Sequence, residues 1–413
     1  MSGAIRLNAI LAREQLPAAQ AETLAYALFS VMPTRRDQPR MPLNLVVVVE
    51  KGTAMEAERQ LEWVQRALGL LGEALTPEDA LGLVVFGDRA KAALPAEPVT
   101  DPAKFKRIVS FLDSHSVGSG ASLLEGLKAG AEELRKHMRP GVASRLLVIS
   151  RSPARQEAEV ERLGRQLVAD GAGVIALGLG HDWSGGLLAR LADAGPGAVR
   201  LVPRANDLPF AMREVVAPLT QLAFTDLKLR LRLSKGVAVR RVFQVFPSIA
   251  NWLPATLSER ELLVPLGDLG TERPCYVLVE FVAPPRESGT VRLAQAEVGF
   301  AIVKPTPRVS RTPAVDLTVS FGQAGPARRE VMRFVEAMQI YNLIDRGVEA
   351  RRGQDFLKAE RFLTNAYRIA GQGGHPAIAE ELSAAIDSLT SADPLPERMS
   401  KHLLFLARMP EEQ

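Results

Sequence analysis

The central part of the chain alternates short apolar runs with amphipathic segments. Apolar runs rich in β-branched residues lie at 44–49, 81–86, 146–149, 174–179 and 199–202. Runs this short are typical of strands that are buried on both faces. Apolar residues at helical spacing predict helices at 56–75, 122–138, 154–170, 185–194 and 207–222, and Asp101-Pro102 opens a shorter one. Strands that alternate with helices predict a mostly parallel sheet with helices on both faces.

The flanking segments follow a period of two instead. Residues 227–233 (LKLRLRL) alternate apolar and basic positions, which predicts a strand with one solvated face. Similar strand signals lie at 5–11, 22–31, 237–246, 261–265, 275–282 and 291–302. Turn residues at even spacing between them predict a β-sandwich. We expect the two N-terminal segments to complete this sandwich, so that the α/β part is an insertion within it.

The C-terminal part changes character twice. Residues 305–327 are rich in proline and polar residues and predict a linker, and the residues beyond them follow a helical period. Gly347, Ala359, Leu363 and Ala366 have the mutual spacing of a tetratricopeptide repeat, although packing of any helical hairpin would produce this spacing as well. The final segment, 398–409, predicts a helix that either docks on the protein or binds a partner.

Composition narrows the functional classes. The 413 residues are 47% hydrophobic and 24% charged, which is typical of globular domains. The net charge of +4 and the lack of a long basic run disfavour nucleic acid as a partner. The single cysteine excludes intramolecular disulfides and cysteine-based zinc sites. No apolar stretch approaches the ~20 residues of a membrane helix and no signal-peptide pattern opens the chain, so we expect a cytoplasmic protein without membrane insertion. The richness in Ala, Arg, Leu and Gly suggests a bacterial source.

Five segments in the α/β part resemble, in order, those of the von Willebrand factor A (VWA) domain. They read LNLVVVVEKGTAM, GLVVFGDRA, SVGSGASLLEGL, RLLVISRSPA and VIALGLGHDWSGGLLARLADAG. More closely, the chain resembles bacterial proteins that place this domain within a β-sandwich and add a C-terminal helical region. The resemblance implies a Rossmann-like domain at 41–222, sandwich strands at 1–40 and 223–304, a linker at 305–327, and a helical, TPR-like segment with a tail helix at 328–413.

The resemblance also implies a metal-ion-dependent adhesion site, which this sequence has altered. The family motif supplies Asp-x-Ser-x-Ser from one loop, Thr from a second and Asp from a third, and these oxygens suit Mg²⁺. The matching positions are Glu50, Gly52, Ala54, Ala121 and Arg151. Three of them have no side-chain oxygen and one is cationic. We therefore expect that the metal site is lost and that no cofactor binds.

The altered site leaves several arrangements open. In one hypothesis the Arg151 guanidinium replaces the ion and pairs with Glu50. In the alternative, both side chains face solvent, where an ion pair contributes little. Residual cation binding would draw on oxygens of Glu50, Asp88, Ser119 and Ser122.

Enzyme signatures are weak. Ser150 lacks the Gly-x-Ser-x-Gly context of a nucleophile elbow, and Gly118-Ser119-Gly120 lacks the lysine of a phosphate-binding loop. Cys275 lies in a strand-like run and is expected to be buried. The sequence therefore predicts a protein that is not an enzyme.

The loops at the carboxyl edge of the sheet are the predicted partner-binding surface. This edge comprises Lys51, Thr53, Arg89, Ser119, Ser122, Arg151, Arg155, His181, Asp182 and Trp183. An exposed Trp beside Arg is typical of interface hot spots, whereas a local role for Trp183 in capping the sheet is the alternative.

These observations predict an interaction scaffold that binds protein partners without metal and favours acidic patches. The resemblance suggests an AAA+ ATPase or a kinase or phosphatase signalling module as partner. A homo-oligomeric structural protein and a VWA domain with unconventional Mg²⁺-dependent ligand binding remain alternatives.

Overall fold

The computed structural model describes residues 3–56, 59–180, 183–252, 255–304, 306–390 and 397–408. The chain divides into two compact units. The α/β unit comprises Gln38–Thr225 together with Val303–Pro307. The second unit comprises Met1–Asp37, Asp226–Ile302 and Arg308–Gln413.

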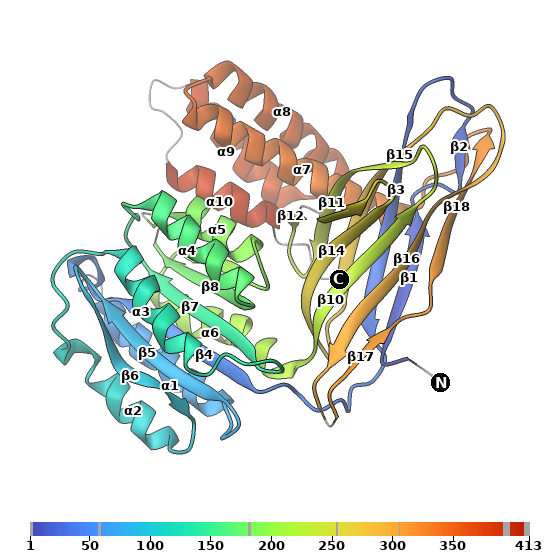
Figure 1. The fold of residues 1–413 in the computed structure, drawn as a ribbon. Coiled ribbons are helices and arrows are strands. Elements are labelled where there is room, and N and C mark those ends of the chain that lie inside the picture. Colours follow the sequence, from blue (N-terminus) through green and yellow to red (C-terminus); the bar gives the residue numbers. More distant parts are fainter. Residues whose placement is uncertain are drawn as a thin grey trace. The chain divides into compact units, whose positions relative to one another are not determined.

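A six-stranded sheet forms the centre of the α/β unit, in the order β6-β5-β4-β7-β8-β9 (Figure 1). Its strands are β4 (Leu43–Glu50), β5 (Ala80–Phe86), β6 (Ala90–Pro98), β7 (Ala143–Ser150), β8 (Ala172–Leu179) and β9 (Ala198–Val202). All pairs are parallel except β5 with β6. Every residue of β4, β5, β7 and β8 is buried, so the interpretation of the continuous apolar runs as doubly covered strands is confirmed.

Helices cover both faces of this sheet (Figure 1). One layer contains α1 (Gln60–Ala74), α2 (Pro102–Ser110) and α6 (Leu208–Val216), whose apolar residues share a core with alternate residues of β4. The other contains α3 (Leu123–Arg135), α4 (Glu157–Ala169) and α5 (Gly185–Asp193). Short 3₁₀ helices lie at η1 (Thr53–Met55), η3 (Leu112–Ser114), η4 (Ala205–Asp207) and η5 (Leu219–Gln221).

Two sheets form the body of the second unit, and their strand pairs are antiparallel except for the parallel pair of β18 with β2. The five-stranded sheet has the order β1 (Ile5–Leu11), β3 (Thr23–Pro33), β15 (Cys275–Ala283), β11 (Ala238–Phe246), β12 (Ala250–Trp252). The other sheet runs β13 (Ala255–Ser258), β14 (Glu261–Gly270), β10 (Leu222–Leu233), β16 (Gly289–Ile302), β18 (Val315–Gly322), β2 (Gln15–Pro17). Strands from both sides of the α/β segment meet in the five-stranded sheet, because β3 pairs with β15.

The linker predicted at 305–327 is wrong over much of its length. Strands β17 (Arg308–Arg311) and β18 lie within it, and both pair with β16. Strand β18 buries Leu317, Val319 and Phe321, while the residues between them are polar. The neighbouring prolines and this polar alternation gave the segment the composition of a linker, although cross-strand pairing makes it part of the sandwich.

Four helices complete the second unit: α7 (Arg329–Arg352), α8 (Phe356–Gly373), α9 (Pro376–Thr390) and α10 (Glu397–Arg408). Apolar residues of α7 share one core with Leu28, Phe243 and Leu278 of the five-stranded sheet. Helix α7 crosses α8 closely at Gly347, where a Cβ atom would lie 2.8 Å from Leu363 Cδ2. The helices are therefore a layer on the sandwich.

Helix α10 lies at the position predicted for the tail helix. Leu403 and Ala407 are buried in the core that α7 shares with the sheet, so this helix docks on the protein. Among the described residues, none of the helices combines the length and the apolar character that crossing a membrane requires.

Candidate functional site

The topology of the α/β sheet brings the predicted site residues together at one edge. Strand β4 pairs with β5 on one side and with β7 on the other, so the chain reverses its winding direction there. In doubly wound sheets, ligands bind at the carboxyl ends of the strands that flank such a reversal. Glu50 is the last residue of β4 and Ser150 is the last residue of β7, while Gly87 follows β5.

Glu50 is fully buried, and its carboxylate makes four hydrogen bonds to the end of β7. Oε2 accepts from Ser150 Oγ at 2.8 Å, from the Arg151 N–H at 2.8 Å and from the Ser152 N–H at 3.0 Å. Oε1 accepts from Ser152 Oγ. Charge-assisted bonds of this kind satisfy a buried carboxylate without a counter-cation.

The hypothesis that the Arg151 guanidinium pairs with the Glu50 carboxylate is therefore wrong. Arg151 contacts Glu50 through its backbone N–H. Ion pairs among the described residues do not include the Arg151 side chain, which is half-buried and lies near Gly180. The alternative, in which both side chains face solvent, is also wrong for Glu50.

Backbone fills the space beside Gly52. A Cβ atom at this position would overlap the carbonyl oxygen of Gly120 and would lie 3.0 Å from that of Ser119. The loops are joined by hydrogen bonds from the Thr53 N–H to Ser119 O at 3.0 Å and from the Ser122 N–H to Gly87 O at 2.7 Å. A side chain at position 52 would require the loop at 117–122 to move away.

The remaining oxygens proposed for residual cation binding have other contacts. Asp88 is exposed, and its Oδ2 accepts the Gly120 N–H at 3.1 Å. Ser119 is exposed and its carbonyl accepts from Thr53, whereas Ser122 is half-buried at the start of α3. Within the described ranges, no group of three or more His, Cys, Asp or Glu side chains is arranged to hold a metal ion.

The residues of the predicted partner-binding edge differ in their exposure to solvent. Thr53, Arg89 and Arg155 are exposed, and Lys51 is half-buried. The expectation of an exposed Trp183 is wrong. This side chain is fully buried because Gly178 of β8 leaves room for the indole directly against the strand. The local capping role is the correct interpretation, and His181 and Asp182 lie outside the described residues.

Sequence reasoning missed two groups of residues at this edge. The hydroxyls of Ser150 and Ser152 donate hydrogen bonds to the Glu50 carboxylate. The sequence feature that could have indicated this is the pair of serines at the end of β7, next to β4, which ends in an acidic residue. Lys91 and His115 were not considered. Burial lowers the pKa of His115, and the positive charges of Lys91 and Lys51 lower that pKa further. These three side chains therefore lie close to one another.

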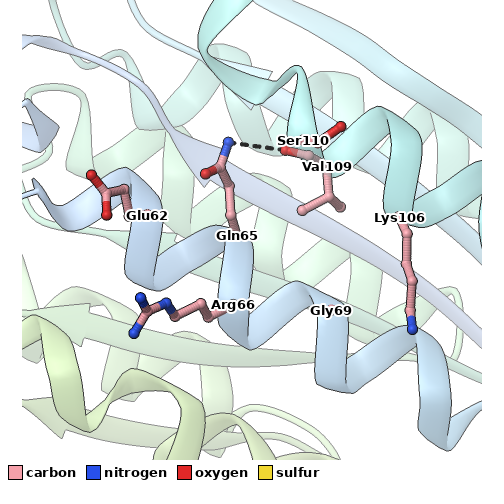
Figure 2. Close-up of a pocket in the computed structure, with 7 residues that line it drawn as sticks. All are labelled: Glu62, Gln65, Arg66, Gly69, Lys106, Val109 and Ser110. Atoms are coloured by element: carbon pink, nitrogen blue, oxygen red, sulfur yellow. Dashed lines mark hydrogen bonds between the residues drawn. The ribbon is translucent and has the colours of Figure 1, made fainter.

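A shallow hollow of about 470 Å³ lies between α1 and α2 (Figure 2). It is lined by Glu62, Gln65, Arg66, Gly69, Lys106, Val109 and Ser110. Gln65 Nε2 bridges the two helices by donating to Val109 O at 3.1 Å. Glu62 pairs with Arg59, and Lys106 pairs with Glu73. Two charged side chains of the lining thus pair with residues outside the hollow, and the lining residues form no nucleophile and base pair.

Cys275 is buried in β15, as expected. Burial raises the pKa of its thiol to about 12, so the sulfur is protonated at neutral pH. This cysteine is a packed core residue.

Comparisons with known proteins agree with this architecture. Residues 43–201 match the family model of the von Willebrand factor type A domain, a family of protein-interaction domains. A von Willebrand factor type A protein from Catenulispora acidiphila superposes with a TM-score of 0.80 at 16% identity, covering 98% of this chain and 97% of that chain.

Two further solved structures share the fold. The ArnB paralog VWA2 from Sulfolobus acidocaldarius gives a TM-score of 0.58 at 13% identity, with 98% of each chain covered. The human COPII-coat protein Sec24c gives 0.55 at 14% identity and covers 90% of this chain and 58% of that chain. No curated protein matches the chain by sequence. At sequence identities this low, the similarity to these structures concerns the fold alone.

Proposed function

Because residues 43–201 form a von Willebrand factor type A domain, we propose that this protein is a non-enzymatic interaction scaffold whose α/β unit binds protein partners without a metal ion. Partners would bind at the carboxyl edge of the sheet. The helical layer of the second unit would offer another surface, so that the chain can bridge two partners.

The state of Glu50 carries this proposal. Its carboxylate accepts from two backbone N–H groups and two hydroxyls, so both of its oxygens are hydrogen-bonded to the end of β7 and the two residues that follow. A Mg²⁺ site needs free oxygen ligands in octahedral geometry. Gly52, Ala54 and Ala121 contribute no side-chain oxygen, and Gly52 is covered by the Gly120 carbonyl. The residues present at this edge do not fit a magnesium ion.

Calorimetric titration with Mg²⁺ tests the loss of the metal site. We expect no binding heat for the wild type or for Arg151→Asp alone, because a single carboxylate does not replace the missing hydroxyls. The positive comparator carries Glu50→Asp, Gly52→Ser, Ala54→Ser, Ala121→Thr and Arg151→Asp together. Saturable Mg²⁺ binding by the wild type would contradict the proposal.

Affinity capture from the host extract tests where partners bind. The same partner should be recovered in magnesium and in EDTA, and it should be lost with Arg151→Asp. The matched control is Arg162→Asp, which changes an exposed arginine on α4, away from this edge. Recovery in magnesium alone would contradict a metal-free surface. Absence of any partner, together with a mass that grows with concentration in light scattering, would favour the homo-oligomeric alternative.

A further inference from the structure

Three cationic side chains and one histidine lie along the carboxyl edge. Lys91 lies near the start of β6, Lys51 follows β4 and Arg151 follows β7, and these strands occur in the order β6-β5-β4-β7. His115 follows η3 and is close enough to Lys91 and Lys51 for their charges to act on it. We call Lys91, His115, Lys51 and Arg151 the cationic strip.

Among the described residues, the acids of the same loops form no ion pair with the strip. Glu50 is buried, and its charge is satisfied by groups of β7. Ion pairs within the described part of the chain do not include Lys51, Lys91 or Arg151. Asp88 and Asp113 are exposed acids of neighbouring loops, yet the charges that shift His115 are those of the two lysines. Within the described loops, the strip therefore keeps an excess of positive charge, carried by the exposed Lys91 and the half-buried Lys51 and Arg151.

We infer that the cationic strip receives an acidic peptide segment of a protein partner, with the carboxylates spread along an extended chain. This inference rests on the proposed function and names the partner's chemistry. Neighbouring strands lie about 4.8 Å apart, so β6 to β7 spans roughly 14 Å. An extended peptide covers that distance with about four or five residues. Cations distributed in this way suit several carboxylates, whereas a single phosphate requires donors that converge on one point.

His115 gives the strip a pH dependence. Its charge is disfavoured by burial and by Lys91 and Lys51. Carboxylates bound on the strip would offset those two positive charges and raise the pKa of the imidazole. Proton uptake is then coupled to binding, so acidic segments should bind more tightly as the pH falls from 7.5 to 6.0.

Fluorescence anisotropy with a labelled peptide of six alternating Glu and Asp residues tests the inference. Lys51→Gln, Lys91→Gln and Arg151→Gln should each weaken binding by about two- to fivefold, because each removes one positive charge of the strip. Lys235→Gln, an exposed lysine in a turn of the second unit, is the matched control and should leave the affinity unchanged. The tightening at lower pH should disappear in His115→Gln.

Several outcomes overturn the inference. They are equal weakening by Lys235→Gln, equal binding of the Gln/Asn version of the peptide, or binding of inorganic phosphate at least as tight as that of the peptide. If the captured partner is retained in EDTA while the strip variants bind the peptide like the wild type, the cationic strip is wrong and the metal-free scaffold stands. Capture in magnesium alone contradicts the scaffold itself.

Discussion

At position 52, a single missing side chain allows two loops to close on each other. Because the Gly120 carbonyl covers the place of a Cβ atom, we expect Gly52→Ser to lower the free energy of unfolding by about 1–3 kcal/mol, the usual cost of overpacking. Restoring this family serine should not restore metal binding. Urea denaturation with and without 10 mM Mg²⁺ (about a thousandfold excess over protein) measures both effects.

Gly69→Ser is the matched control for this substitution. A Cβ atom at Gly69 meets no other atom within 4 Å, and serine is a better helix former than glycine. This variant should therefore be as stable as the wild type or slightly more stable. A Gly52→Ser protein of wild-type stability, or one stabilised by Mg²⁺, would show that the loop at 117–122 opens readily.

The sequence located Glu50 and Arg151 at one site but not the atoms that join them. Matching strands along the chain predicts which residues lie at the ends of β4 and β7. It does not reveal that the Glu50 carboxylate reaches the backbone N–H groups of Arg151 and Ser152. Trp183 was misassigned for a similar reason. Its burial depends on the space left by Gly178 on another element. The loop sequence around Trp183 does not reveal that this space exists.

At the scale of elements, Asp79 connects the starts of two neighbouring strands, β4 and β5. It is fully buried just before β5, and it accepts from the Leu43 N–H at 2.8 Å and from Arg40 Nη2 at 2.6 Å. Burial alone would raise its pKa, but the hydrogen bonds from Arg40, Thr76 and Leu43 outweigh burial and lower it. Asp79 therefore holds the start of β4 beside the start of β5 in its charged form.

Asp79→Asn should reveal this contribution as a pH-dependent loss of stability. A carboxyl group whose pKa is lower in the folded state stabilises the fold above its unfolded pKa of about 3.9, and the contribution is lost as pH falls through the folded pKa. We expect a loss of about 1–3 kcal/mol at pH 7 that shrinks toward pH 3. Urea midpoints between pH 7 and pH 3 measure it.

The exposed Asp113 provides the comparison for Asp79. Asp113→Asn should change stability little at any pH in this range. A difference between Asp79→Asn and the wild type that persists unchanged at pH 3 would indicate a packing effect instead of a charge effect.

The strands that the sequence predicted are those whose own residues carry a clear strand pattern. The apolar runs of β4, β5, β7 and β8 are buried on both faces, and the sequence alone identifies them. Strand β6 (AKAALPAEP) is rich in alanine and proline, and β18 lies among prolines, so neither was found. Both form because a neighbouring strand that the sequence does identify, β5 or β16, supplies the hydrogen bonds.

At the scale of the whole molecule, the first and last parts of the α/β unit lie next to each other. The Met41 N–H donates to Leu222 O at 2.6 Å, which joins the first and last parts of the unit. Its sheet and the helices α1, α2 and α6 share a core of their own. A segment with adjacent ends and an independent core has the properties of a domain that folds by itself.

The fragment 38–225 should therefore unfold cooperatively in urea, with helix and strand signals in circular dichroism. It should be less stable than the same unit in the full chain, because it lacks the loop at 303–307. In that loop Lys304 pairs with Glu78 at 2.7 Å, and Val303 packs against the core. The fragment 38–207 is the control, since it lacks α6, which packs against α1, and it should fail to fold. A fragment 38–225 without a cooperative transition would mean that the α/β unit depends on the sandwich for its stability. Its edge could then not be tested apart from the full chain.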